Sequence, residues 1–199
     1  MDSIFKYFDT FSKLSHESRE LIAMHLEFET VRKNDYLWRV GQRNGNIYFI
    51  KSGVARLFFY NEQGEETTVH FVSQNKFVAD LESLTMNTPS SVSCAATIDT
   101  EVIVLTSSVL GKLSKEVFEW NELMRKITEK TLFDKIKTRD KIFQGESRQR
   151  YLSFLEHFPS VANHVQASHI ASYLGISQFT LSHIKGELNK IDFLRNSKN

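Results

Sequence analysis

The feature that most constrains this chain lies near its C-terminus, where two short apolar helix faces are separated by a glycine. Ile170 and Leu174 have the spacing of one buried helix face, and Leu181 and Ile184 have the spacing of a second. Gly175, between the two, can adopt the positive φ that ends a helix. The pattern predicts a helix-turn-helix.

The second helix of this motif has a polar outer side. Ser177 is a suitable N-cap, because its hydroxyl can accept hydrogen bonds from the free backbone N–H groups of the first turn. A recognition helix would direct its outer residues to base edges and phosphates. The alternative is a helical hairpin packed in an ordinary all-α subdomain. The residues predicted to contact DNA are Ser168, Ser177, Gln178, Phe179, Thr180, Ser182, His183 and Lys185.

Composition limits the classes of protein that remain. The 199 residues are 41% hydrophobic, with no apolar run long enough to span a membrane, and the first residues lack the order of a signal peptide, so we expect a cytoplasmic protein. The formal net charge of +1 is uneven: residues 1–112 carry 11 Lys/Arg against 14 Asp/Glu, and residues 113–199 carry 14 against 10. The basic surplus therefore lies on the side of the helix-turn-helix, although it is small.

The N-terminal part has a helical pattern followed by a strand pattern. Residues 3–26 read as helical, with Ser15 as a candidate N-cap, and residues 28–105 consist of short apolar runs separated by glycine. Such runs predict an antiparallel barrel or double-sheet roll, closed by a strand at residues 102–105. Residues 77–84 are expected to form a single helical turn between strands.

Residues 113–143 are predicted to form one long helix, followed by a hinge at residues 144–147. Its apolar residues recur every three or four positions, and a helix of this length cannot be covered entirely by so small a domain. We expect its first turns to pack on the barrel and the exposed seam to pair with a second copy of the chain. The predicted dimer-interface residues are Trp120, Met124, Ile127, Leu132 and Ile136.

Taken together, the glycine-punctuated barrel, the seam helix and the helix-turn-helix resemble the cyclic AMP receptor protein / fumarate-nitrate regulator (Crp/Fnr) family over the whole chain. The strongest local matches are residues 50–57 (Ile-Lys-Ser-Gly-Val-Ala-Arg-Leu) and 169–185, preceded by Arg-Tyr-Leu at 150–152. The resemblance implies an α+β fold: a cyclic-nucleotide-binding-like jelly-roll sensor over 1–112, a dimerisation helix over 113–144 and a winged-helix-like DNA-binding domain over 145–199. It also implies a homodimer on a pseudo-palindromic operator in double-stranded DNA.

The resemblance breaks where family members hold the cyclic nucleotide. Their motif Phe-Gly-Glu-Leu, followed by Arg-Ser/Thr-Ala, corresponds here to Phe-Val-Ala-Asp-Leu at residues 77–81, and the arginine position falls on Ser90. No Lys or Arg lies between Lys76 and Lys112. A buried phosphate without a cation is costly, so cyclic AMP is disfavoured, and the sensor is expected to bind another small-molecule effector or none.

An effector pocket is therefore predicted by position. Aromatic residues on the barrel strands would form its apolar wall, and polar groups around it would orient a ligand, although each residue is also explained as core, turn or cap. The candidates are Phe58, Tyr60, Phe71, Asp80, Leu81, Glu82, Ser90, Ser91, Thr128 and Thr131.

The DNA-facing side departs from the family as well. Family members commonly carry Glu and, four residues later, Arg on the recognition helix, and these positions match Phe179 and His183. Only residues 191–199 follow the expected end of that helix, which predicts a rudimentary wing at most. The alternative function is a sensor or interaction protein that keeps the fold but has lost specific DNA reading.

No other chemistry is predicted. His157, His164 and His169 have spacings that match no compact metal site, and a single cysteine, Cys94, excludes an internal disulfide and an iron–sulfur cluster. No Ser/His/Asp or phosphate-loop arrangement is present, so we expect neither an enzyme nor a cofactor.

Overall fold

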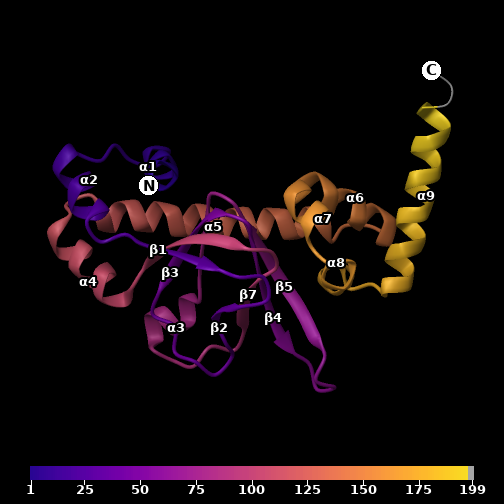
Figure 1. Ribbon diagram of the computed structural model, residues 1–199, viewed down its shortest axis with the longest axis horizontal. Helices are drawn as coiled ribbons and strands as arrows, with labels where there is room; N and C mark the ends of the chain where they lie inside the picture. The colour runs from indigo at the N-terminus through magenta and orange to yellow at the C-terminus, as the bar shows by residue number, and fades with distance from the viewer. Residues whose placement is uncertain (197–199) are drawn as a thin grey trace.

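The computed structural model describes residues 1–196, with side chains described through residue 190. Figure 1 shows two sheets beside one long helix, with a group of helices at one end of it. The elements are, in chain order, α1 (Asp2–Asp9), α2 (His16–Ala23), β1 (Glu27–Val31), β2 (Tyr36–Trp38), β3 (Ile47–Ser52), β4 (Val54–Tyr60), β5 (Glu66–Ser73), β6 (Lys76–Ala79), α3 (Leu81–Met86), β7 (Ser93–Ala96), β8 (Thr100–Leu105), α4 (Ser107–Glu116), α5 (Trp120–Ile142), α6 (Ser147–His157), α7 (Pro159–His164), α8 (Ala167–Leu174) and α9 (Gln178–Asn196).

The strands form two four-stranded antiparallel sheets, in the orders β1-β8-β3-β6 and β2-β7-β4-β5. The predicted antiparallel roll is therefore confirmed, including its closing strand β8. The prediction for residues 77–84 was only half right, because Phe77 pairs with Phe49 of β3 and the helix α3 begins four residues later. Asp80 separates the two elements by capping α3, since its carboxylate accepts from Ser83 N–H at 3.1 Å.

The first sheet is apolar on both faces. On β3, Tyr48 and Ile50 face the second sheet, whereas Ile47 and Phe49 face the helices. This two-sided burial makes the sheet the shared wall of two cores. One core fills the roll and the other joins the sheet to α1, α2, α4 and α5.

One close approach inside the roll requires glycine. Gly53, between β3 and β4, has φ +100°, and a Cβ there would lie 2.4 Å from Thr100 Oγ1 and 2.7 Å from Thr100 Cα. The neighbouring Val54 N–H donates to the same threonine oxygen at 3.2 Å. A side chain at this position would force β4 and the start of β8 apart.

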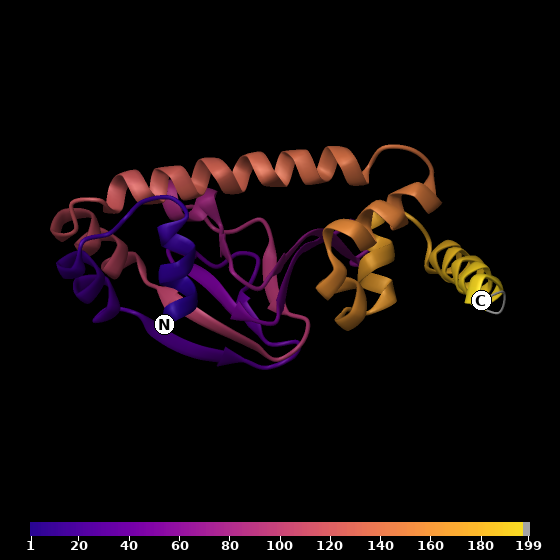
Figure 2. The ribbon, with the colours of Figure 1, turned by 90° about the horizontal axis from the view of Figure 1, so that it is seen from above.

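The predicted single helix over 113–143 is wrong, because the chain bends at residues 117–119 between α4 and α5. Val117 is extended, at φ −106° and ψ 112°, and its side chain is buried beside Leu113 and Trp120. The two helices therefore meet at a buried apolar residue of the core that packs on the first sheet. Figure 2 shows α5 running alongside both sheets toward the C-terminal helices.

The C-terminal helices α6–α9 form a third core that includes two residues of the roll. Gly145, at φ +80°, lies in the short connection between α5 and α6. Phe154, Phe158 and Tyr173 surround Phe71 of β5, with ring centroids 5.4–6.4 Å from the Phe71 ring. The C-terminal helices are thus packed directly on the outer face of the second sheet.

Candidate nucleic-acid interface and effector cavities

The helix-turn-helix is formed by α8 and α9, and its prediction is confirmed. Gly175 ends α8 in the left-handed conformation, at φ 66°, and its N–H donates to Ser172 O at 3.2 Å. Ser177 caps α9, because its hydroxyl accepts from Thr180 N–H at 3.0 Å. Leu181 and Ile184 bury the inner side of α9 against this core.

The outer side of α9 carries four exposed side chains near its start: Gln178, Phe179, Ser182 and His183. Phe179 is 81% exposed, an unusual state for a large aromatic ring. His183 Nδ1 lies 3.7 Å from Glu187 Oε1, one helical turn away. These groups form a recognition surface with apolar, amide, hydroxyl and imidazole chemistry.

The remaining predicted DNA contacts are placed differently. Thr180 and Lys185 are partly buried, and the Lys185 ammonium lies 5.8 Å from the centre of the Tyr151 ring. Ser168, near the start of α8, is also partly buried, whereas Ser177 is exposed. Of the predicted set, Lys185 and Thr180 therefore lie beside the recognition surface rather than at its centre.

The recognition helix is longer than expected. It continues without interruption to Asn196, so the expected separate segment after residue 190 is helix as far as the described residues extend. A wing that followed α9 would lie beyond residue 196, outside the described residues. Figure 1 shows the C-terminal end of α9 projecting away from the other helices.

The first helix of the motif, α8, is hydrogen-bonded to strand β5. Thr68 N–H donates to Ser172 Oγ at 2.9 Å, and the Ser172 hydroxyl donates to Glu66 O at 3.2 Å. Glu66 also pairs with the buried Arg56, and its carboxylate lies 3.9 Å from His169 Nε2. Burial and the nearby Arg56 lower the pKa of His169, although Glu66 opposes this shift. Two hydrogen bonds thus join α8 to β5.

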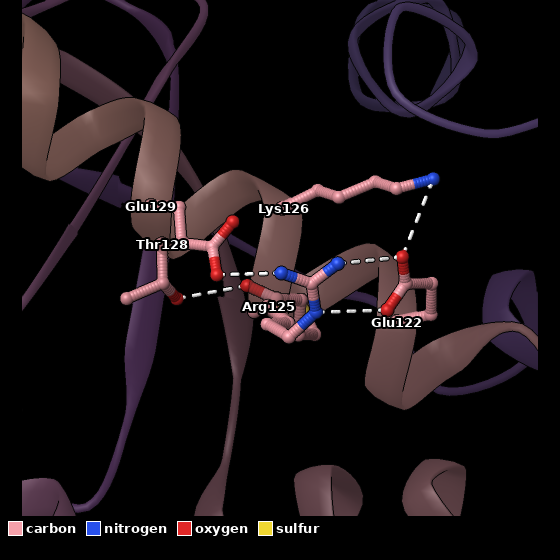
Figure 3. A network of polar contacts seen from close by, with 6 residues as sticks. Glu122, Arg125, Lys126, Thr128 and Glu129 are labelled. Carbon is pink, nitrogen blue, oxygen red and sulfur yellow. Dashed lines mark hydrogen bonds and ion pairs between the residues drawn. The ribbon is translucent and has the colours of Figure 1, made fainter.

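A cavity of about 140 Å³, called here the inner cavity, lies between the roll and α5. Three of the predicted pocket residues line it: Leu81, Thr128 and Thr131. Most of the other lining side chains are aliphatic, among them Ile47, Leu57, Val72 and Met124. The Thr128 hydroxyl donates a hydrogen bond to the Met124 carbonyl oxygen at 2.8 Å. Figure 3 draws this bond as a dashed line from Thr128.

The other predicted pocket residues lie outside the inner cavity. Phe71 faces the C-terminal helices, and Phe58 points to the outer side of the second sheet beside Tyr36 and Tyr60. Strands β4 and β5 do form a wall of the inner cavity, through Leu57 and Val72, but the side chains of Phe58 and Phe71 point to the opposite face of the sheet. Asp80, Glu82, Ser90 and Ser91 also do not line it: Asp80 caps α3, Glu82 and Ser91 are exposed, and the Ser90 hydroxyl donates to Val92 O at 2.7 Å.

A second cavity, of about 350 Å³ and called here the outer cavity, adjoins the first and reaches the C-terminal helices. His70 and Lys135 line both cavities, and Thr68, Arg139 and Tyr173 line only the outer one. Burial lowers the pKa of His70 to about 3, with Lys135 and Lys76 adding to the shift, so its imidazole is neutral at pH 7. Burial also raises the pKa of Tyr173 to about 12, against the opposing charge of Arg139.

His70 and Lys135 were not among the predicted site residues. His70 is two residues from Val72 on β5, so alternation puts both on the inner face, which was a usable signal. The juxtaposition with Lys135 depends on how α5 crosses the strand.

The predicted dimer-interface residues divide into two groups along α5. Trp120 and Ile127 are each only 2% exposed and belong to the chain's own core, so their assignment to a dimer interface is wrong. Met124 is partly buried and lines the inner cavity. Leu132 and Ile136 are 52% and 48% exposed, and Phe133, which the periodicity did not select, is 61% exposed.

The described part of the chain contains no group of three or more His, Cys, Asp or Glu side chains arranged to hold a metal ion. Cys94 is buried between the two sheets, where burial raises the pKa of its thiol. No helix within residues 1–196 is long and apolar enough to cross a membrane.

The comparisons with known proteins agree with this architecture. Residues 28–117 match the family model of the cyclic nucleotide-binding domain. FixK2 from Bradyrhizobium japonicum has a similar structure, with a TM-score of 0.71 and 17% identity, over 84% of this chain and 86% of that one. The regulator CLP from Xanthomonas campestris, described as c-di-GMP responsive, gives a TM-score of 0.69 at 13% identity, over 89% and 93% of the two chains.

A Crp/Fnr-family regulator from Eubacterium rectale is similar as well, with a TM-score of 0.66 and 18% identity, over 90% of this chain and 85% of that one. A comparison with the curated proteins finds no match. The chain therefore shares its fold with these regulators. More particularly, the protein has the Crp/Fnr architecture, with its cyclic nucleotide-binding domain matched over residues 28–117.

Proposed function

We propose that the protein is a dimeric, sequence-specific DNA-binding transcription regulator of the Crp/Fnr type. The observation that carries this proposal is the start of α9, where a capped helix presents Gln178, Phe179, Ser182 and His183 to solvent on a Crp/Fnr fold. Amide and imidazole groups can read base edges in the major groove, and an aromatic ring can contact a thymine methyl group. In this proposal residues 1–112 sense, residues 113–144 dimerise and residues 145–199 bind DNA.

Dimerisation is supported by Leu132, Phe133 and Ile136, which form an apolar patch on the free half of α5. Three large exposed apolar side chains within two helical turns are typical of a protein interface. A parallel pairing of two α5 helices would bring two copies of α9 to one DNA duplex, as a pseudo-palindromic operator requires.

The effector of this regulator is proposed to be something other than cyclic AMP. The segment between Lys76 and Lys112 contains no Lys or Arg, Arg43 donates to Asn87 O at the end of α3, and the buried Ser90 hydroxyl is already bonded to Val92 O. A cyclic phosphate bound there would lack its charge-assisted partner. Calorimetry should therefore show cyclic AMP and cyclic GMP binding no tighter than about 1 mM.

Selection of random DNA duplexes by the purified protein tests the main proposal. A palindromic sequence should be enriched by the unchanged protein and lost with His183→Ala, while Lys190→Ala, on the same helix, should keep the enrichment. If no sequence is enriched, the protein keeps the fold without reading DNA. Two features would then explain the loss. His183 stands where family members carry Arg and lies beside Glu187, and the exposed Phe179 stands where they carry Glu.

A further inference from the structure

The inner and outer cavities share His70 and Lys135 in their linings, so they adjoin along α5 and are called here the joined cavities. The inner part is walled mainly by aliphatic side chains, with only the hydroxyl groups of Thr128 and Thr131 and the two shared residues adding polarity. The outer part carries the cations Lys135 and Arg139 and the hydroxyl groups of Thr68 and Tyr173. One end of the space is therefore apolar and the other end is positively charged.

The charge of this space is not balanced by the protein. Neither lining contains an Asp or Glu side chain, and within residues 1–190 neither of the exposed residues Lys135 and Arg139 forms an ion pair. Arg125, on the same helix, shows the contrast: Glu122 and Glu129 hold its guanidinium at 2.7 and 2.5 Å (Figure 3). Two uncompensated cations at the mouth of an apolar cavity favour a ligand with a negative charge.

The size of the inner cavity limits the rest of the ligand. Its volume is about 140 Å³, close to the roughly 150 Å³ of an apolar cavity known to hold benzene. The apolar body of the ligand should therefore have about six to eight non-hydrogen atoms. A nucleotide base with its ribose is larger than this.

We infer that the joined cavities bind a small monocarboxylate with an apolar body, aryl or short-chain alkyl, whose body fills the inner cavity and whose carboxylate lies between Lys135 and Arg139. This inference rests on the proposed function, because it names the effector class of that regulator. The negative charge of this ligand would lie beside Lys135 and Arg139 of α5, whereas the family's phosphate-binding motif corresponds to residues 77–81 and Ser90 near α3.

The position of the carboxylate gives the ligand a route to the DNA-binding helices. Tyr173 belongs to α8, and Thr68 of β5 donates its N–H to Ser172 of the same helix. An anion in the outer cavity contacts both sides of this junction and stabilises the arrangement in which α8 is docked on β5. A ligand that binds one arrangement more tightly shifts the population toward it.

The inference is tested by calorimetry and saturation-transfer NMR on the full chain without DNA, with butanoate, hexanoate, benzoate and phenylacetate as probes. At least one should bind with a dissociation constant of about 1 mM or tighter. Its uncharged amide, such as phenylacetamide, should bind at least tenfold more weakly. Absence of binding by all four acids at 5 mM, or equal binding of acid and amide, would overturn the inference.

Variants locate the ligand. Lys135→Gln should weaken binding about tenfold, which is the loss of one charge-assisted contact. Lys137→Gln, an exposed lysine outside both linings, should leave it unchanged, and Thr128→Met should block the inner cavity. Unchanged affinity in both Lys135→Gln and Thr128→Met places the ligand elsewhere and contradicts the inference.

The two proposals fail separately. If duplex selection enriches a palindrome while no acid binds, the regulator stands and the carboxylate site is wrong. If an acid binds and Lys135→Gln weakens binding about tenfold while no duplex is enriched, the site stands and its role in DNA binding is wrong.

Discussion

The two halves of α5 differ in what covers them, although both follow the same apolar spacing. In the first half, Trp120 and Ile127 are sealed in the core that joins the helix to the first sheet. In the second half, Leu132, Phe133 and Ile136 remain about half exposed or more. A repeat of apolar residues along a helix thus shows that a surface will be covered, but it does not show whether the same chain or a second copy covers it.

The largest effect is expected from Ile127→Asp in the first half. Loss of a buried isoleucine costs about 2–5 kcal/mol, and an unpaired buried carboxylate adds to that cost. We expect a protein that is largely unfolded in chemical denaturation experiments at neutral pH. A folded Ile127→Asp protein that is merely monomeric would show that the two halves have been assigned the wrong way round.

A smaller effect on folding and a large effect on assembly are expected from the double change Phe133→Asp and Ile136→Asp. Each side chain contributes about 1.5–3 kcal/mol when fully buried in an interface, so the dimer dissociation constant should rise at least about a hundredfold. Sedimentation should show a dimer for the unchanged chain and a 23.1 kDa monomer for the variant. The same change at the exposed Lys130 and Lys137 serves as the matched control. Dimers that survive the double change would refute the proposed interface.

DNA binding depends on the second half of α5, because pairing through this half would bring two recognition helices together. His183→Ala should cost about 1–3 kcal/mol on the selected operator and much less on a scrambled duplex. Lys185→Ala should weaken both duplexes alike if its ammonium leaves Tyr151 for a phosphate. Fluorescence anisotropy at several salt concentrations measures both variants. Equal losses on operator and scrambled DNA for His183→Ala would mean that α9 reads no sequence.

The smallest effect concerns the pH dependence of stability where the second half of α5 crosses β5. The pKa of His70 is lowered from 6.5 to about 3 in the folded protein. As pH falls, the unfolded chain protonates His70 before the folded protein does. The contribution of neutral His70 to stability is therefore complete above pH 6.5 and is lost as pH falls below that value. Between pH 7.5 and 5 the loss should be about 1–2 kcal/mol.

Urea unfolding at a series of pH values measures this loss, and His70→Gln is the control, since it removes the titrating group. The slope of stability against pH should be shallower in His70→Gln. Identical slopes would mean that the imidazole is accessible to solvent and does not lie between Lys135 and the roll.

Local sequence signals predicted the elements well wherever the cause of the structure is itself local. Ser15, Ser177 and Gly175 were assigned to helix ends from their chemistry, and each caps or ends a helix in the structure. The strands from β3 to β5 also followed from alternation and glycine turns. The bend at Val117 could not be predicted this way, because its apolar spacing fits a straight helix equally well.

The candidate effector site was predicted less well. Thr128, Thr131 and Leu81 were chosen by position and do line the inner cavity, whereas Phe58 and Phe71 face away from it. A strand's two faces alternate regardless of which one meets the ligand. The choice between them depends on the partner sheet and on the C-terminal helices, which take Phe71 into their own core.

The sequence by itself determined the order of elements, the helix-turn-helix and the lack of Lys or Arg between Lys76 and Lys112, because these depend on residue type and short spacing. Only the tertiary structure decided which half of α5 is buried, which side chains face the cavities and that Lys135 lies beside His70. These are contacts between segments far apart in the chain, set by how the sheets and helices pack to bury the most apolar surface. Residue spacing within one segment carries no information about them.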